Sequence, residues 1–102
     1  MVDTTLNHNA VNSTFIYDKM FGNPTINYTN VNLSNSQSTR NLVMMTNPTD
    51  LDFTLTVNQI NGNAVTGSTT LKAGKGNKLS IFEFAIVRNS AGVYRIYGFE
   101  NP

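Results

Sequence analysis

The sequence contains no cysteine and no tryptophan, and only 13% of its 102 residues are charged. The absence of cysteine excludes disulfide cross-links and thiolate metal sites. Seven basic and six acidic residues leave a formal net charge of +1, and nucleic-acid binding relies on clustered Lys and Arg. No apolar run reaches the ~18 residues that indicate a membrane span. We therefore expect neither a nucleic-acid partner nor a membrane partner.

Asparagine and threonine supply most of the polarity that charged residues would otherwise give. The chain has 16 Asn and 13 Thr, more than a quarter of its residues. Asn favours turns, Thr favours strands, and both are weak helix formers. The composition therefore predicts an all-β protein with an amide- and hydroxyl-rich surface. Such surfaces are typical of extracellular or virion-borne β-proteins, although an AT-rich genome would give the same bias.

The first 24 residues carry few apolar side chains and show no clear period. We expect an extended N-terminal arm over residues 1–24. A short helix is the alternative, because Ser13 could cap it and Ile16 and Met20 have i,i+4 spacing. Residues 25–102 are expected to form an antiparallel β domain, either a small sandwich or a barrel-like module.

Alternation and turn residues divide the rest of the chain into about six strands. Residues 51–58, LDFTLTVN, alternate apolar and polar side chains, which predicts a half-buried strand. The dipeptide Asn61-Gly62 predicts a tight hairpin. Two final strands, KLSIFEFAIVR and VYRIYGF, flank the turn sequence NSAG. No helix of ordinary length fits after residue 24.

The last two strands are apolar on both faces. If residues 89–92 form the loop, Arg88 pairs with Val93. One face then carries Phe82, Phe84, Ile86, Phe99, Tyr97 and Arg95, and the other carries Glu83, Ala85, Val87, Gly98, Ile96 and Tyr94. A small sandwich covers only one face of each sheet, so the arm, a partner subunit or both must cover the second. We predict a core and subunit interface that comprises Phe82, Glu83, Phe84, Ile86, Tyr94, Arg95, Tyr97 and Phe99.

Glu83 lies between aromatic residues on the first of these strands. An unpaired carboxylate would be costly to bury there. We expect a structural ion pair with Arg40, Arg88 or Arg95, or a position at the rim of the apolar surface. A register-fixing pair across a subunit boundary and a catalytic role are the alternatives.

The sequence AGKGNK at 73–78 resembles a phosphate-binding loop only loosely. In the phosphate-loop pattern, Gly-Lys is followed by Ser or Thr and opens a helix. Here Lys75 is followed by Gly76, and a strand comes next. We therefore predict a hairpin turn in which Gly74 and Gly76 supply positive φ angles.

No residue set in the sequence supports catalysis. His8 is the only histidine and has no recognisable nucleophile beside it. Asp50 and Asp52 could offer oxygens to Ca²⁺, but a solvated edge or a turn cap is the favoured interpretation. We expect no enzyme activity, no catalytic or metal-binding residues and no cofactor.

Tyrosines offer one further kind of site. Tyr28, Tyr94 and Tyr97 could form a platform on which sugars or bases stack. Cross-strand packing of the same rings is the simpler interpretation. Tyr28 and Tyr94 remain a candidate ligand platform, and carbohydrate binding is the alternative function that it implies.

Residues 47–99 combine a Thr-rich alternating strand, an Asn-Gly turn, the turn sequence TLKAG, an aromatic strand and a terminal hairpin that contains GVYRI. This series resembles the small trimeric β-modules of bacteriophage tail fibres, baseplates and head fibres, while residues 1–46 lie outside the resemblance. The resemblance implies a homotrimer with a structural or adhesive role on the capsid or tail surface of a virion. Other virion proteins and host-surface glycan are the partners it implies, and it carries over no catalytic residues.

Overall fold

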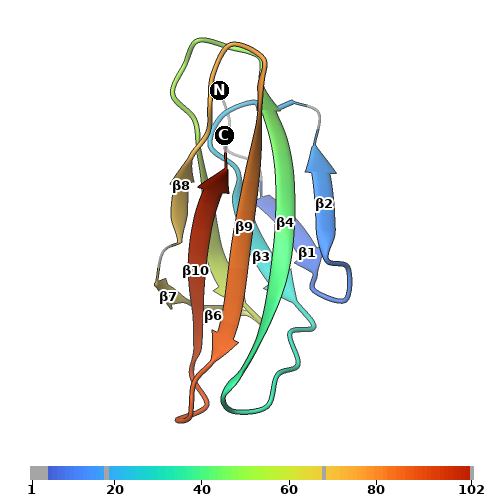
Figure 1. The fold of residues 1–102 in the computed structure, drawn as a ribbon, viewed down its shortest axis with the longest axis vertical. Coiled ribbons are helices and arrows are strands. Elements are labelled where there is room, and N and C mark those ends of the chain that lie inside the picture. Colours follow the sequence, from blue (N-terminus) through green and yellow to red (C-terminus); the bar gives the residue numbers. More distant parts are fainter. Residues whose placement is uncertain (1–4, 18, 68, 102) are drawn as a thin grey trace.

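Two β-sheets make up the fold in the computed structural model, which describes residues 5–17, 19–67 and 69–101 (Figure 1). Sheet A contains β1 (Thr5–Asn9), β3 (Thr25–Thr29), β5 (Thr54–Ile60), β6 (Asn63–Ala64) and β8 (Thr70–Lys72). Sheet B contains, in spatial order, β2 (Thr14–Tyr17), β4 (Gln37–Asn47), β9 (Lys78–Arg88), β10 (Tyr94–Asn101) and β7 (Thr66–Gly67). The all-β prediction is confirmed. The described segments contain no helix that could cross a membrane.

The pairing within both sheets is mixed. β4, β9 and β10 are antiparallel neighbours, and β5 pairs antiparallel with β6 and β8. The strands β1, β3 and β5 run parallel, as do β2 with β4 and β7 with β10. Among the described strands no backbone ladder joins sheet A to sheet B. The fold is therefore an open sandwich and not a barrel.

The expected N-terminal arm is extended, and it lies within the sandwich. β1 pairs with β3 at the edge of sheet A, and β2 pairs with β4 at the edge of sheet B. The short-helix alternative is wrong, because Phe15 and Tyr17 are turned inward while Ile16 between them is exposed, which is the period of a strand. Residues 1–4 and 18 of this segment lie outside the described residues.

The core fills the space between the sheets. The side chains with almost no exposed surface include Ile26, Tyr28, Leu55, Val57 and Ile60 from sheet A and Val43, Met45, Phe82, Phe84, Ile86 and Ile96 from sheet B. The alternation predicted at 51–58 is confirmed over β5, where Leu55 and Val57 are buried and Thr54 and Thr56 face outward. Asn61 and Gly62 form the expected hairpin turn, with φ angles of 53° and 81°.

The final hairpin has a register different from the predicted one. Arg88 pairs with Tyr94, and Asn89 closes the loop by donating its backbone N–H to the carbonyl of Val93. The turn therefore holds three residues, 90–92, and Gly92 takes the positive φ of 81° that such a loop requires. The predicted pairing of Arg88 with Val93 is wrong by one residue. This shift moves every side chain of β10 to the opposite face.

Candidate functional site

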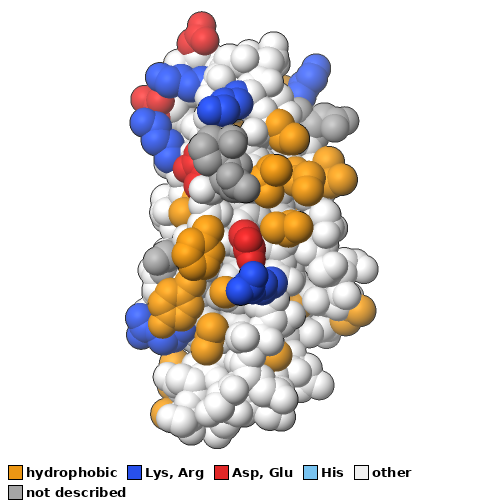
Figure 2. Space-filling model, in the orientation of Figure 1, with side chains coloured by type: hydrophobic (Ala, Val, Ile, Leu, Met, Phe, Trp, Pro, Cys, Tyr) orange, Lys and Arg blue, Asp and Glu red, His pale blue; other side chains and the backbone are white. Residues whose placement is uncertain are grey.

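The most prominent candidate site is the outward side of sheet B, which carries a large apolar surface that no other part of the described chain covers. Alternation along the strands turns the following side chains outward, and we call them the outer apolar face: Ile16, Leu42, Met44, Leu79, Ile81, Ala85, Val87, Tyr97 and Phe99. Ile16 is 67% exposed, Tyr97 40% and Phe99 59%. Figure 2 views this side of the molecule and shows hydrophobic side chains spread over it. Contiguous apolar surfaces of this kind mark interaction sites in soluble proteins.

An ion pair occupies the middle of the outer apolar face. The Arg40 guanidinium Nη1 lies 2.9 Å from Glu83 Oε1. In Figure 2 a red and a blue side chain lie together between two groups of orange ones. The arginine side chain is 77% exposed and the glutamate 34%, so the pair contributes little to the stability of a monomer. The predicted ion pair of Glu83 is confirmed, with Arg40 as its partner.

The size of the outer face is suited to a protein interface. Five strands lie side by side in sheet B, and β4 and β9 are 11 residues long. With strands about 4.8 Å apart and about 3.3 Å per residue, the face covers on the order of 600 Å². A stable protein–protein interface uses about 800 Å² from each partner. Burial of this face together with its rim would reach that range.

The predicted interface residues separate into two groups. Phe82, Phe84 and Ile86 are completely buried between the sheets, whereas Glu83, Arg95, Tyr97 and Phe99 lie on the outer side. The prediction that these aromatic residues share one face is wrong, because the register differs by one residue. Sequence analysis also missed Ile16, Leu42 and Met44 on this side. Alternation in FIY and in NLVMM was the available signal, but apolar residues occupy both phases there.

Tyr94 and Tyr28 do not form a common exposed platform. Tyr28 has no exposed surface. Tyr94 is half-buried, its hydroxyl donates to the Val31 carbonyl at 3.2 Å, and the Arg88 guanidinium lies 5.4 Å from its ring centroid. Both rings therefore serve packing, which was the simpler of the two interpretations.

His8 lies in the core where the edge strand β1 of sheet A meets β2 of sheet B. Its imidazole stacks on Phe15 with ring centroids 3.7 Å apart, and its Nε2 lies 2.6 Å from the Tyr17 hydroxyl. The ring of Tyr28 packs against it edge-on at 5.5 Å. The Nδ1 atom has no hydrogen-bond partner within the described part of the chain. A side chain without exposed surface cannot contact a substrate in this conformation, so His8 has a structural place here.

Burial also changes the protonation of His8. Removal from water disfavours the charged imidazolium, and this lowers the pKa of His8 from 6.5 to about 4. The ring is therefore neutral at pH 7. Burial likewise raises the pKa of the Tyr17 and Tyr28 hydroxyls, so this group of side chains carries no charge near neutrality.

Asp52, one of the two acidic candidates for a calcium site, is engaged by lysines. Asp52 Oδ1 lies 3.0 Å from the Lys75 ammonium and 3.8 Å from that of Lys72. The hydrogen bond from Lys75 and the charges of both lysines lower the pKa of Asp52. No group of three or more His, Cys, Asp or Glu side chains with metal-binding geometry occurs in residues 5–17, 19–67 and 69–101. The ammonium groups of Lys72 and Lys75 therefore compete with a calcium ion for the Asp52 carboxylate.

The AGKGNK segment connects the two sheets. It leads from β8 in sheet A to β9 in sheet B, so it is a turn, as predicted, but not a hairpin. Gly76 has the predicted positive φ of 71° and Asn77 has one of 64°, whereas the prediction of a positive φ at Gly74 is wrong. The backbone N–H groups of Gly76 and Asn77 donate to the carbonyls of Thr49 and Asn47. These donors are used within the fold, and a strand follows them in place of the helix that a phosphate site needs.

Comparison of the chain with protein-family models, with curated proteins and with solved structures finds no significant match.

Proposed function

We propose that this protein is a structural component of a bacteriophage virion that assembles with copies of itself through the outer apolar face of sheet B. The observation that carries the proposal is the extent of this face, which a solitary molecule leaves in water. Burying a large apolar side chain contributes roughly 1.5–3 kcal/mol. Burial of several side chains of the outer apolar face would therefore favour association. The resemblance of residues 47–99 to phage appendage modules supports the virion setting.

The central ion pair supports a specific contact over a loose one. When the outer faces of several copies meet, Arg40 and Glu83 lie inside the contact. Both charges stay paired within their own copy, which limits the cost of burying them. Their remaining hydrogen-bonding atoms would need partners on the neighbouring copy, so the pair would favour contacts that supply such partners. In the trimer that the resemblance implies, three such faces meet around one axis on the capsid or tail surface, next to other virion proteins.

Introduction of a charge on this face should abolish assembly. The chain has a mass of 11.2 kDa, and light scattering coupled to size-exclusion chromatography should give three times that mass at micromolar concentration. Phe99→Glu places a carboxylate beside Glu83 in the contact and should give a monomer. Val11→Glu is the matched control, because Val11 is exposed in the turn between β1 and β2, beside Asn30 and Asn61 and away from the outer apolar face, and it should leave the mass unchanged. A monomeric parent protein would overturn the proposal, and a dimer would overturn the threefold arrangement.

Host-surface glycan binding is the second candidate function, and the outer side of sheet A favours it. The strand register aligns one row of hydroxyls, Thr5, Thr25, Thr56 and Thr70, and a second row of amides, Asn7, Asn27 and Gln59. Amides and hydroxyls in such rows match the hydrogen-bonding groups of a sugar. Sheet A would then face a glycan while sheet B faces other copies of the chain.

A glycan array tests this second function. The parent protein should bind a set of glycans that Gln59→Ala no longer binds, because that substitution interrupts the row of amides. Asn35→Ala, in the loop before β4, should bind as the parent does. An array without signal, or equal binding by both variants, would remove glycan binding as a function.

A further inference from the structure

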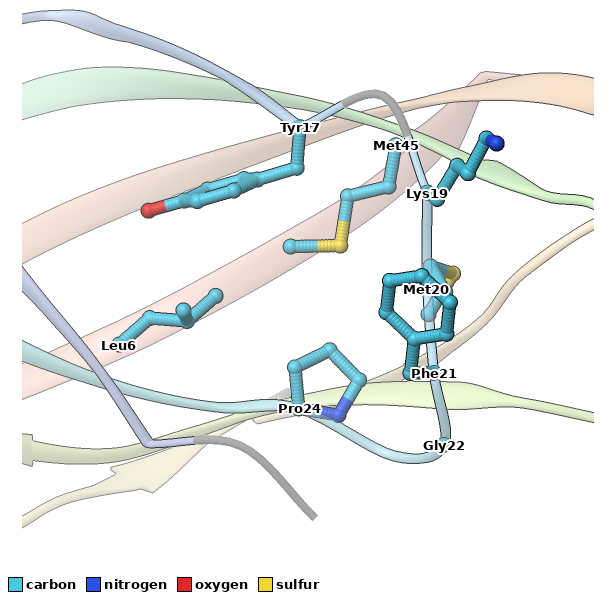
Figure 3. A pocket seen from close by; sticks show the side chains of 8 residues that line it. All are labelled: Leu6, Tyr17, Lys19, Met20, Phe21, Gly22, Pro24 and Met45. Atoms are coloured by element: carbon cyan, nitrogen blue, oxygen red, sulfur yellow. The ribbon is translucent and has the colours of Figure 1, made fainter. Parts of the chain in front are cut away.

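An apolar cavity lies at the edge of the sandwich, between the strands β1 and β2 and the segment that follows them (Figure 3). Its volume is about 120 Å³. Its lining consists of Leu6, Tyr17, Lys19, Met20, Phe21, Gly22, Pro24 and Met45. The cavity is separate from the outer apolar face, because Tyr17 and Met45 belong to the inward side of sheet B.

Backbone contacts hold the walls of the cavity in place. Met20 donates its N–H to the Thr46 carbonyl of β4 at 2.8 Å. Further along, the Pro24 carbonyl accepts the N–H of Thr56, and the Asn23 side chain accepts that of Thr54. The segment from Met20 to Pro24 is thus fastened to both sheets, so the cavity exists before any ligand arrives. Preformed apolar cavities are the usual form of small-molecule sites.

The lining determines what can bind. Among the described residues that line it, Lys19 carries the only charge, and its ammonium points away from the cavity in Figure 3. The Tyr17 hydroxyl is already engaged with His8 at 2.6 Å. The side chains described in the lining therefore present no free polar group toward the cavity. A closed apolar cavity of about 150 Å³ accepts benzene; this one has about 120 Å³ and opens to solvent beside Phe21, which is 64% exposed.

Two methionines make the cavity suitable for an aromatic ring. The Met45 side chain extends toward the centre of the cavity in Figure 3, and Met20 forms part of its wall. Thioethers adapt their shape to irregular gaps and make favourable contacts with aromatic rings. From the volume, the uncharged lining and these sulfur atoms, we propose that the cavity binds one neutral aromatic ring of about the size of benzene. This site is independent of the assembly proposed above.

Methyl NMR of the methionines tests the proposal with benzene as the probe. The ε-methyl resonances of Met20 and Met45 should shift saturably, with half-saturation at about 1 mM or below. Met44 lies next to Met45 in the chain but on the outer face of sheet B, so its resonance should not shift. Benzoate should bind at least tenfold more weakly than benzene, because the lining offers its carboxylate no partner.

A matched pair of variants confirms the location. Leu6→Phe fills the cavity with a ring and should weaken benzene binding tenfold or more. Leu42→Phe makes the same change on the outer face and should bind benzene as the parent does. Shifts that grow without saturation, an equal shift at Met44, benzoate binding as tight as benzene binding, or unchanged binding by Leu6→Phe would each overturn the site. The titration of the parent protein decides the matter even if one variant fails to fold.

Discussion

Lowering the pH from 7 to 4 is expected to remove about 3 kcal/mol from the free energy of unfolding through His8 alone. In the folded protein, burial lowers the pKa of His8 to about 4 from its ordinary value of 6.5. Below pH 6.5 the unfolded chain therefore binds a proton that the folded chain does not. This contribution of His8 to the free energy of unfolding is fully present above pH 6.5 and decreases as the pH falls toward 4. It changes no further once His8 is protonated in both the folded and the unfolded state.

The surroundings of His8 explain why the folded protein resists its protonation. The imidazole stacks on Phe15, and the titratable groups that pack against it are the hydroxyls of Tyr17 and Tyr28. Both hydroxyls are neutral in this pH range, because burial raises their pKa. No carboxylate is among these contacts to stabilise an imidazolium. A protonated His8 would strain the junction of β1 and β2, where the two sheets meet.

Urea denaturation at pH 7 and at pH 4.5, followed by circular dichroism, measures the effect. His8→Phe removes the titrating group but keeps a ring against Phe15, so most of the difference in stability between the two pH values should disappear. Tyr17→Phe is the control, since it removes the hydroxyl and leaves the imidazole buried, and it should keep the difference. If His8→Phe lost as much stability in acid as the parent does, surface carboxylates and not His8 would cause the loss.

Local signals predicted the parts of the fold that depend on neighbouring residues. Strict alternation at 51–58 predicted the strand β5, which begins only at Thr54, and Asn61-Gly62 forms a hairpin because both residues tolerate positive φ. The segments around His8 and Phe15 also alternate, but His and Ala are weak apolar markers in a run rich in Asn. Their parallel pairing joins segments far apart in the chain, such as β2 with β4. No local pattern specifies such partners.

The outer apolar face was predicted only in part, because the predicted turn of the last hairpin differs from the observed one by a single residue. A loop of four residues would pair Arg88 with Val93, whereas the observed loop of three pairs Arg88 with Tyr94. Both loops fit the sequence NSAG, since Gly92 suits either. The prediction of an apolar second face depends little on this choice. The identity of its aromatic residues depends on it entirely, because the side-chain period of a strand is two.

The two phenylalanines of this hairpin provide the sharpest test of the observed register. Phe84 has no exposed surface and lies opposite Gly98, whereas Phe99 is 59% exposed on the outer side. Phe84→Ala should lower the free energy of unfolding by about 3–5 kcal/mol, because it leaves a cavity in the core. That is a large part of the roughly 5–15 kcal/mol that holds such a domain together. Under the predicted register both rings would lie on the same face, and their costs would be similar.

Phe99→Ala should cost less than about 1 kcal/mol when it is measured on monomers, as expected for a surface substitution. Urea denaturation at nanomolar concentration, where the proposed assembly would be dissociated, gives this value. If the copies assemble as proposed, the same variant should lose at micromolar concentration the additional stability that assembly would give the parent, because the buried ring is missing from the contact. Equal losses for Phe84→Ala and Phe99→Ala in monomers would contradict the register. If the loss of stability for Phe99→Ala did not change with protein concentration, this would contradict the proposed role of Phe99 in assembly through the outer apolar face.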